Sequence, residues 1–528
     1  MSETAETPAQ HSSGEQTSGS EPISGDQVKS DQPSGGQPVG RTVGDKVAIA
    51  LAFGSSAAVL VLELVSLRLV APYLGLTLET NTAVIGVALA AIATGAMMGG
   101  KFADAVPPTR TLGPLVMFGG ALVLLILPVV RWTGEAVRGS AGDAVFLAVA
   151  IALFLPASML AAVTPMVTKL RLSTLTQTGT VVGRLSAYAT VGAIVGTVLT
   201  GFVFVARVPT STIVLGLGGV LVLGGAALTI YFRGLKAAAR PLVLALIGTG
   251  LTTFAPRPCD LETAYHCARV VADPSREGGR TLYLDQLRHS YVDLDDPQHL
   301  EFDYTKDFGA AIDGTWPGAT PLTALHVGGG GLTMPHYLQA TRPGSENKVY
   351  EIDSGVIEVD KAQLGAKPGP GLDLQVRDGR LGVRSEPAES RELVVMDAFG
   401  GVAVPWHLTT REVVADVRRV LKPGGLYLVN VIDYPPQAFA KAEARTLRAE
   451  FPYLAVIARP NALSGAAGGN FVLLGSDRPV DAAAIRQRLA GRSTLLSDPA
   501  AVQTFIGAGP VLTDDYAPVD QLLTPYPS

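Results

Sequence analysis

Charge is scarce in this sequence, and neither sign dominates it. Asp, Glu, Lys and Arg make up 16% of the 528 residues, and 41 basic residues against 46 acidic ones give a net charge of −5. This balance gives no indication of nucleic-acid binding, which needs clustered basic residues. Hydrophobic residues nevertheless reach 48% with a mean hydropathy of +0.32, which in a chain with one clearly polar half requires a membrane half.

Cysteine is almost absent, since Cys259 and Cys267 are the only two. They can form a disulfide if their Cβ atoms face each other, whereas in a cytosolic domain they would stay free thiols. No second Cys or His pair follows at metal-ligand spacing, so no metal site is expected.

Large apolar side chains are nearly absent from residues 1–44, which are mostly Ser, Gly, Glu, Gln, Pro and Thr. Such a segment cannot bury enough surface to offset the entropy of ordering, so a disordered tail is expected. It also lacks the succession of charged and apolar regions that defines a cleaved signal peptide.

Residues 45–256 hold long apolar runs separated by short polar loops. Each run is close to the roughly 20 residues that cross about 30 Å of hydrocarbon. The sequence therefore predicts a transmembrane bundle of about seven helices, near residues 47–67, 80–100, 112–130, 144–167, 187–206, 211–232 and 238–256. Because Arg240 and Pro241 shorten the last run, six spans are the alternative.

The basic residues at the span ends predict the orientation in the cell membrane. One set of loops carries Arg41, Lys46, Lys101, Arg110, Lys169, Arg171, Arg184, Arg233, Lys236 and Arg240, and the opposite set carries Arg68, Arg131, Arg138 and Arg207. Since Lys and Arg accumulate on the cytoplasmic side, the N-terminus is predicted to be cytoplasmic. Seven spans then place the polar half outside the cytoplasm with its cysteines bridged, whereas six would return it to the cytoplasm.

Within the bundle, Gly192 and Gly196 form a pair of small residues four positions apart, which favours close helix–helix packing. Glu63 and Arg68 are charged residues in or near the first span, for which an ion pair or an interfacial position is an alternative to a functional role.

The polar half begins with residues 257–315, where a small β-rich domain is expected. Residues Arg280 to Asp295 alternate apolar and polar side chains, which predicts two antiparallel strands with a turn near residues 285–288. His289 and Tyr291 in this stretch are candidates to face a substrate cleft.

A glycine-rich turn opens the domain predicted for residues 316–528. An apolar run ends in Gly328 to Gly331, a helix-like segment follows, and a second apolar run ends in Glu351. The glycines let the backbone turn tightly and approach a ligand, and the start of the helix offers free N–H groups. An acid about 20 positions further on can accept hydrogen bonds from a ribose, so the unit predicts a nucleoside-type site.

Two further apolar runs also end in acids: one ends at Val376, just before Asp378, and the next leads directly into Asp397. A helix with Glu412 and a strand at residues 426–432 follow. Strands alternating with helices predict a doubly wound parallel sheet, in which ligands bind at the carboxyl ends of the strands. Glu351, Asp378 and Asp397 are therefore expected to surround one site.

With these residues the chain resembles, over roughly Arg280 to Leu523, the spermidine synthase (polyamine aminopropyltransferase) family, in particular its membrane-fused bacterial members. The run GRLSAYATVGAIVGT is similar to a membrane segment of that subgroup. The resemblance implies a multi-pass α-helical membrane bundle followed by a small β-layer and an α/β Rossmann-like domain of the methyltransferase type. It also implies transfer of an aminopropyl group from decarboxylated S-adenosylmethionine, a co-substrate and not a tightly bound cofactor, to putrescine with release of methylthioadenosine.

The resemblance implies roles for individual residues. Asp397 matches the first Asp of the catalytic loop, the proposed proton acceptor. The expected nucleoside-binding residues are Gly328, Gly329 and Gly330 of the glycine-rich loop, Glu351 on the ribose hydroxyls, and Asp378 and Gly379 beside the adenine.

The chain departs from the family on the amine side of the site. Gly331 stands where an Asp usually holds the diamine, Gly400 replaces the second acid of the catalytic loop, and His289 aligns with an expected Gln. A cationic diamine that meets fewer carboxylates should bind more weakly. Asp514 and Asp515 resemble the family's C-terminal acidic segment and are candidates, with His289, for substrate binding.

The leading hypothesis is a membrane-tethered aminopropyltransferase that acts on small-molecule nucleoside and amine substrates, with the lipid bilayer and a homo-oligomer as its other expected partners. The alternatives are an S-adenosylmethionine-dependent methyltransferase that acts on another acceptor and a non-catalytic membrane protein that senses nucleosides or polyamines. Loss of the diamine acids favours the two alternatives, whereas retention of Glu351, Asp378 and Asp397 favours an enzyme.

Overall fold

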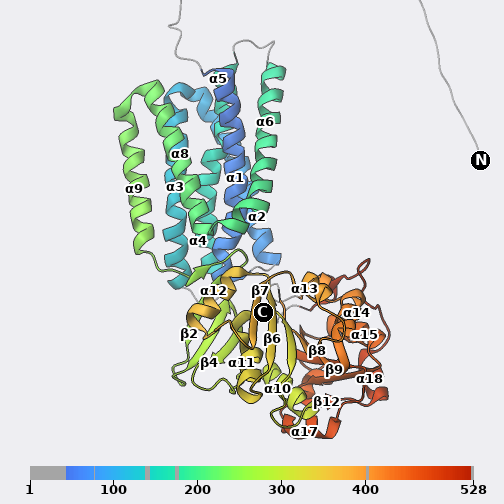
Figure 1. Ribbon diagram of the computed structural model, residues 1–528. Helices are drawn as coiled ribbons and strands as arrows, with labels where there is room; N and C mark the ends of the chain where they lie inside the picture. Colours follow the sequence, from blue (N-terminus) through green and yellow to red (C-terminus); the bar gives the residue numbers. More distant parts are fainter. Residues whose placement is uncertain (1–42, 76–77, 137–142, 173–177, 400–403, 525–528) are drawn as a thin grey trace, which may run out of the picture. The chain divides into compact units, whose positions relative to one another are not determined.

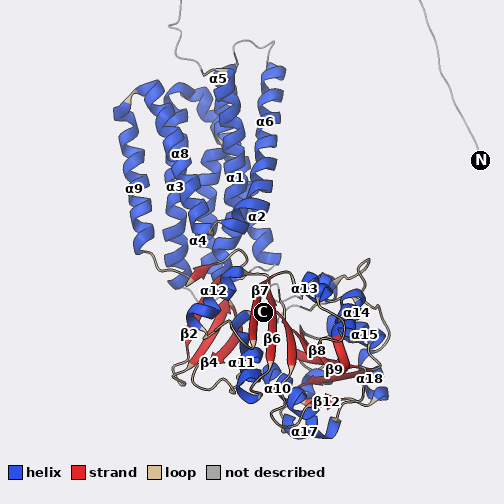
Figure 2. Cartoon of the chain, in the orientation of Figure 1, coloured by secondary structure: helices blue, strands red, loops and turns tan. Residues whose placement is uncertain are grey.

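The computed structural model describes residues 43–75, 78–136, 143–172, 178–399 and 404–524. Contacts divide the chain into Met1–Thr42 and Val43–Ser528, and all the described helices and strands belong to the second unit. The tail predicted for residues 1–44 thus falls outside the described residues as far as residue 42, while Val43 is buried and Gly44 precedes the first helix. The first half of this unit is helical, and its strands are confined to the second half (Figure 2).

Long apolar helices form the first half, because a helix satisfies its backbone N–H and C=O groups, except those at its two ends, within its own segment. Among the described residues, seven segments are long and apolar enough to cross a membrane, which confirms the predicted number of long apolar segments. That they cross a bilayer stays a prediction. The helices are α1 (Asp45–Leu74), α2 (Leu78–Ala105), α3 (Pro108–Ala136), α4 (Asp143–Ala161), α5 (Val163–Arg171), α6 (Thr178–Leu199), the short turn η2 (Thr200–Phe204), α7 (Val205–Arg207), α8 (Thr210–Arg233), η3 (Leu235–Ala238) and α9 (Ala239–Phe254).

Helix α6 packs closely against α1, as the two small residues predict (Figure 1). A Cβ atom added at Gly192 would lie 2.2 Å from the carbonyl oxygen of Phe53, and one added at Gly196 would lie 2.8 Å from that of Ala57. Since both distances are shorter than real Cβ contacts allow, these glycines let the two backbones approach, and the packing interpretation of the pair is confirmed.

We expect Gly192→Ala to destabilise the bundle, because overpacking a close contact typically costs about 1–3 kcal/mol. Gly183→Ala on the same helix is the matched control, since a Cβ atom there meets nothing within 4 Å. Thermal unfolding of the full-length protein in one detergent should show a lower midpoint only for the Gly192 variant. Equal midpoints for the two variants would show that this contact does not limit helix approach.

A small antiparallel sheet follows the bundle, with strands β1 (Leu261–Glu262), β2 (Cys267–Ala272), β3 (Gly279–Leu284) and β4 (Leu287–Asp293) in that order. Strands β3 and β4 form the predicted hairpin, in which Leu284 pairs with Leu287. Helix α12 (Ser354–Gln363) packs Val356 and Val359 onto this sheet, so the sheet is held against the next domain.

The second sheet has eight strands in the order β12-β10-β11-β9-β8-β5-β6-β7. Strand β5 lies between β6 and β8 and is parallel to both, so the strand order reverses beside β5. Ligands of open α/β sheets bind at the carboxyl ends of the strands at such a reversal. The strands are β5 (Thr323–Val327), β6 (Glu346–Glu351), β7 (Leu372–Val376), β8 (Arg391–Met396), β9 (Leu421–Asp433), β10 (Tyr453–Ala458), β11 (Gly469–Ser476) and β12 (Thr494–Leu496).

The predicted parallel sheet is confirmed for the predicted strands, β5 to β9, and three further strands toward the C-terminus make the sheet mixed. Strands β5 to β9 are parallel, but β11 pairs antiparallel with β9, and β10 pairs antiparallel with both β11 and β12. The connection from β10 to β11 holds only the short helix α16 (Pro460–Leu463), and antiparallel neighbours need no crossover helix.

Helices cover both faces of this sheet. One face packs Phe308, Leu338 and Ile485 in one apolar cluster, and the other packs Val414, Phe439 and Val502 in a second. The first set comes from α10 (Asp303–Thr315), α11 (Thr333–Thr341) and α17 (Ala482–Leu489), and the second from α14 (Arg411–Val420), α15 (Ala438–Glu450) and α18 (Pro499–Ile506). The remaining helical segments are η4 (Gly330–Leu332), α13 (Gly379–Ser385), η5 (Trp406–Leu408) and α19 (Val519–Leu522).

Candidate active site

The glycine-rich turn lies where three strands end together. The backbone N–H of Gly328 donates to the carbonyl of Tyr350 on β6 at 2.9 Å. Gly328 has a φ of +99°, and a Cβ atom there would lie 2.2 Å from the carbonyl oxygen of Asp397. Only glycine therefore allows the ends of β5, β6 and β8 to approach each other this closely.

The structure also explains why position 331, where the chain departs from the family pattern, is a glycine. Its φ is +76°, and a Cβ atom there would lie 2.1 Å from the hydroxyl oxygen of Ser290 on β4. The position has no room for an aspartate side chain, because Ser290 occupies that space.

Glu351, the last residue of β6, holds the glycine-rich turn through its carboxylate. One oxygen accepts from the backbone N–H of Gly329 at 2.7 Å, and the other accepts from that of Asp353 at 2.8 Å. Burial raises the pKa of Glu351, and these two hydrogen bonds offset part of that rise. Each carboxylate oxygen can accept a second hydrogen bond, so both can still receive ribose hydroxyls.

Asp378 follows β7 and caps the start of α13. Its carboxylate accepts from the backbone N–H of Leu381 at 2.9 Å and lies 3.3 Å from the Nε2 atom of His407. At the adjacent Gly379, a Cβ atom would lie 2.3 Å from the Cγ1 atom of Val327, so the start of α13 packs directly on the end of β5.

These strand ends surround a cavity of about 290 Å³. The predicted residues that line it are Gly328, Gly330, Glu351, Asp378, Gly379, Asp397 and His289. Gly329 belongs to the same group through its hydrogen bond to Glu351. Tyr265 and His266, which sequence reasoning did not select, complete one wall.

Asp397 follows β8 and is fixed by its neighbours. Its backbone N–H donates to the carbonyl of Val327 at 2.9 Å, and its Oδ1 atom accepts from the amide of Asn430 at 3.0 Å. The hydroxyl of Tyr304 also hydrogen-bonds this carboxylate. Burial raises the pKa of Asp397 above its usual range, although both hydrogen bonds lower it in part.

Tyr304, Asn430 and Asn470 are the residues near Asp397 that sequence reasoning missed. The amide of Asn470 donates to the Oδ1 atom of Asn430 at 2.9 Å, so the amide that faces Asp397 has a fixed orientation. Asn430 did carry a signal, because it interrupts the apolar strand β9 and is 2% exposed. Buried amides of this kind need specific partners.

A second cavity of about 680 Å³ adjoins the first, since Asp397, His289 and Phe399 line both. Two of its acids have cationic partners, since Asp303 pairs with Arg459 and Asp307 accepts from Arg492 at 2.9 Å. A third acid of its lining, Glu301, lies 3.1 Å from the Nε2 atom of His299. Asp397 is the acid that lines both cavities, whereas Glu301, Asp303 and Asp307 line only the second.

The structure does not bring Asp514 and Asp515 to either of these cavities. Asp514 accepts from Arg380 at 2.7 Å and from the Thr410 hydroxyl at 2.7 Å, so its carboxylate joins the C-terminal segment to α13 and to the start of α14. Gly400 lies outside the described residues.

Curated relatives of the chain are polyamine aminopropyltransferases. The enzyme of Vibrio vulnificus is 26% identical over 112 residues, which are 21% of this chain and 38% of that protein. The enzyme of Chromobacterium violaceum is 28% identical over 160 residues, which are 30% of this chain and 59% of that protein. The chain thus spans less than two thirds of the length of either relative, and no family model matches it.

Among solved structures, a probable spermidine synthase from Corynebacterium glutamicum has a TM-score of 0.45 and 29% identity, over 48% of this chain and 95% of that protein. Spermidine synthase from Thermotoga maritima has a TM-score of 0.31 and 19% identity, over 49% and 81% of the two chains. The curated relatives confirm the predicted resemblance to polyamine aminopropyltransferases for the part of the chain that they cover.

Proposed function

We propose that the protein is a membrane-tethered aminopropyltransferase that moves an aminopropyl group from decarboxylated S-adenosylmethionine to an amine. One observation carries the proposal: the Asp397 carboxylate lines both cavities, so a base lies between a nucleoside site and an open acceptor site. The resemblance to polyamine aminopropyltransferases supports it.

In the proposed reaction the amine nitrogen attacks the carbon beside the sulfonium. The new C–N bond forms as the C–S bond breaks, its electron pair goes to sulfur, and neutral methylthioadenosine leaves. The ammonium proton passes to Asp397, whose orientation Asn430 and Tyr304 fix. Holding donor and acceptor in adjoining cavities supplies proximity, and a positioned carboxylate supplies general-base catalysis.

The proposed acceptor site offers few unpaired carboxylates to a cationic amine. Gly331 removes one carboxylate of the family pattern, and Asp303 and Asp307 are paired with Arg459 and Arg492. Among the described residues, this leaves Glu301 and Asp397 as the acids of this cavity without an Arg or Lys partner. We therefore expect putrescine to be a weaker acceptor than for enzymes that keep the aspartate, and longer amines to compete with it. Product formation with putrescine, spermidine and monoamines, measured by mass spectrometry, tests this order.

His289 lies beside the acceptor and is expected to stay neutral, since burial lowers its pKa to about 4. A histidine with a lowered pKa is unprotonated above that value, so it does not repel a cationic amine near neutral pH. We expect His289→Gln to change the rate but not the shape of the kcat/KM profile between about pH 5.5 and 8. The neutral role of His289 would be contradicted if the wild-type kcat/KM profile had a limb near pH 6.5, the ordinary pKa of histidine, and the variant lacked that limb.

An S-adenosylmethionine-dependent methyltransferase is the second candidate, because Ser290 fills the place of the diamine-binding aspartate next to Gly331. A full-length protein that methylates an acceptor with ordinary S-adenosylmethionine, and transfers no aminopropyl group, would establish it in place of the first.

We propose further that the α/β half is extracytoplasmic. Helix α1 begins at Asp45, which pairs with Arg171, and near its other end Arg68 donates to the carbonyl of Ala264 in the second half. If α1 spans the membrane, these contacts lie on opposite sides, and the disulfide between Cys259 and Cys267 fits an oxidising compartment. The predicted bridge is present in the structure.

We expect a C-terminal alkaline phosphatase fusion to be active and a matching fluorescent-protein fusion to be dark. The two cysteines should resist alkylation unless they are first reduced. An inactive phosphatase fusion with freely alkylated thiols would place this half in the cytoplasm.

A further inference from the structure

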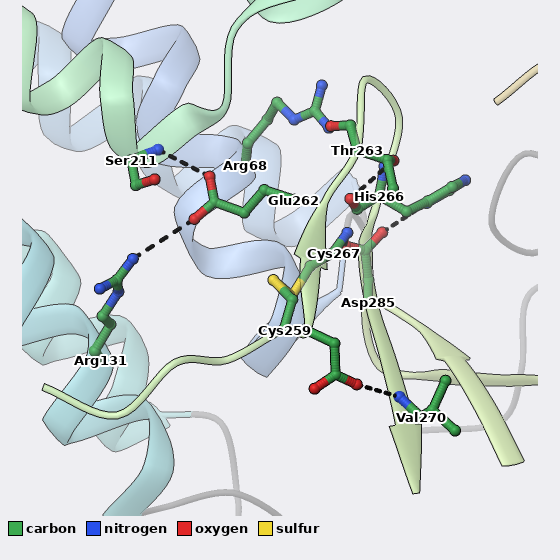
Figure 3. The surroundings of a disulfide bond; sticks show 11 residues. Arg68, Arg131, Ser211, Cys259, Glu262, Thr263, His266, Cys267, Val270 and Asp285 are labelled. Atoms are coloured by element: carbon green, nitrogen blue, oxygen red, sulfur yellow. Dashed lines mark hydrogen bonds and ion pairs between the residues drawn. A yellow bond between two sulfur atoms is a disulfide. The ribbon is translucent and has the colours of Figure 1, made fainter. Parts of the chain in front are cut away.

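The turn between β1 and β2 is closed by the disulfide between Cys259 and Cys267 (Figure 3). Glu262 pairs with Cys267 and Leu261 with Ala268, so residues 263–266 form a short turn at the end of this antiparallel pair. Two of these turn residues, Tyr265 and His266, line the cavity that holds Glu351.

Side chains of the helical bundle hold this turn from one side. Arg68 of α1 donates to the carbonyl of Ala264 and, at 3.3 Å, to that of Thr263. Glu262 accepts from the backbone N–H of Ser211 at the start of α8 at 2.9 Å and lies 3.6 Å from Arg131 of α3. Figure 3 shows these partners converging on the turn from separate helices.

The glycine-rich site holds the turn from the other side. The hydroxyl of Thr263 donates to the carboxylate of Asp353. The backbone N–H of Asp353 in turn donates to the carboxylate of Glu351 at 2.8 Å. A Cβ atom at Gly355 would lie 2.6 Å from the Cγ2 atom of Thr263, so the turn packs directly on the start of α12. Thr263 thus contacts Arg68 through its carbonyl and Asp353 through its hydroxyl.

A third contact fixes the far end of the turn. The Nδ1 atom of His266 lies 2.9 Å from the Asp285 carboxylate, which also accepts from the backbone N–H of Cys267 at 3.0 Å. The turn is therefore restrained by the disulfide, the bundle, the β3–β4 hairpin and Asp353 together.

We infer that Arg68 is a positioning residue for nucleoside binding: through the disulfide-closed turn it holds Asp353 and thereby Glu351 in place. The inference rests on the proposed function, because it takes the Glu351 cavity as the nucleoside site. The helical bundle then sets the geometry of the site and is more than a membrane anchor.

The test uses the full-length protein in lipid nanodiscs, with hydrogen exchange and titration with methylthioadenosine as separate measurements. Arg68→Met keeps the length of the side chain and removes its donors. We expect faster hydrogen exchange in residues 261–268 and 351–355. We also expect a roughly three- to tenfold weaker affinity for methylthioadenosine, because a residue that acts through another contributes only part of the energy of its charged hydrogen bond to binding. Arg68→Lys, which can still reach one carbonyl, should have an exchange rate and an affinity between those of the wild type and of Arg68→Met.

Arg233→Met is the matched control, since Arg233 of α8 also donates to a backbone carbonyl, that of Arg110, at 3.2 Å. It should change neither measurement.

Replacing both Cys259 and Cys267 with Ser should also weaken binding of methylthioadenosine. The loss of binding free energy in the combination with Arg68→Met should be smaller than the sum of the two separate losses, because both changes act through one turn. If Arg68→Met does not fold, Arg131→Met loosens the same turn through Glu262 and takes its place.

The two measurements separate the two ideas. Unchanged exchange at residues 351–355 in folded Arg68→Met, or fully additive effects of the two changes, would overturn the positioning role. A wild-type protein that binds no methylthioadenosine would overturn the proposed function, and faster exchange at residues 351–355 would still show that Arg68 holds Glu351.

Discussion

Asp397→Asn is expected to lower kcat by roughly 10²-fold or more, which is the usual contribution of a general base. The amide keeps the shape of the side chain and its bond to Asn430 after rotation, but it cannot accept the ammonium proton. Because the loss concerns the chemical step, the affinity for methylthioadenosine should change little.

The pH dependence follows from the same carboxylate. Asp397 must be unprotonated to accept a proton, and burial raises its pKa, so activity should be lost as the pH falls through a value above the ordinary 3.8. Asp373→Asn, at an exposed position on β7, is the control and should keep both rate and profile. A wild-type kcat in Asp397→Asn would exclude Asp397 as the base.

Glu351→Ala is expected to weaken methylthioadenosine binding by at least tenfold. In the proposed nucleoside site the change would remove two charge-assisted hydrogen bonds to the ribose, each worth roughly 1.5–3 kcal/mol, and tenfold corresponds to about 1.4 kcal/mol. It also leaves the N–H groups of Gly329 and Asp353 without their carboxylate, which loosens the turn.

Calorimetric titration of the full-length protein measures this loss, with Glu358→Ala on the exposed face of α12 as the control. Thermal unfolding of both variants establishes that they are folded. Unchanged affinity in folded Glu351→Ala would remove Glu351 from the nucleoside site.

The sequence predicted the elements whose signals are local. The apolar runs predict the long helices, and the alternation around residues 280–295 predicts the β3–β4 hairpin. The acids at the end of β6 and just after β7 and β8 are predicted to meet. Parallel strands place their carboxyl ends on one edge, so spacing along the chain was enough to bring Glu351, Asp378 and Asp397 together.

Features that depend on contacts between distant segments were not predictable in this way. Tyr304 reaches Asp397 from α10, and Asn470 orients Asn430 from β11, which runs antiparallel to β9. The sequence suggested that Asp514 would serve the amine site, but Arg380 and Thr410 hold its carboxylate elsewhere. No local pattern carries such pairings, because they follow from tertiary packing.

In the proposed reaction an aminopropyl group passes to an amine while Asp397, which lines both cavities, accepts the proton. The most direct test is mass spectrometry of full-length protein incubated with decarboxylated S-adenosylmethionine and putrescine, with Asp397→Asn in parallel. We predict that the wild type forms spermidine and methylthioadenosine in equal amounts and that the variant forms almost none. If the folded wild type forms neither spermidine nor methylthioadenosine with putrescine, and transfers no aminopropyl group to any other amine, the proposed reaction is contradicted.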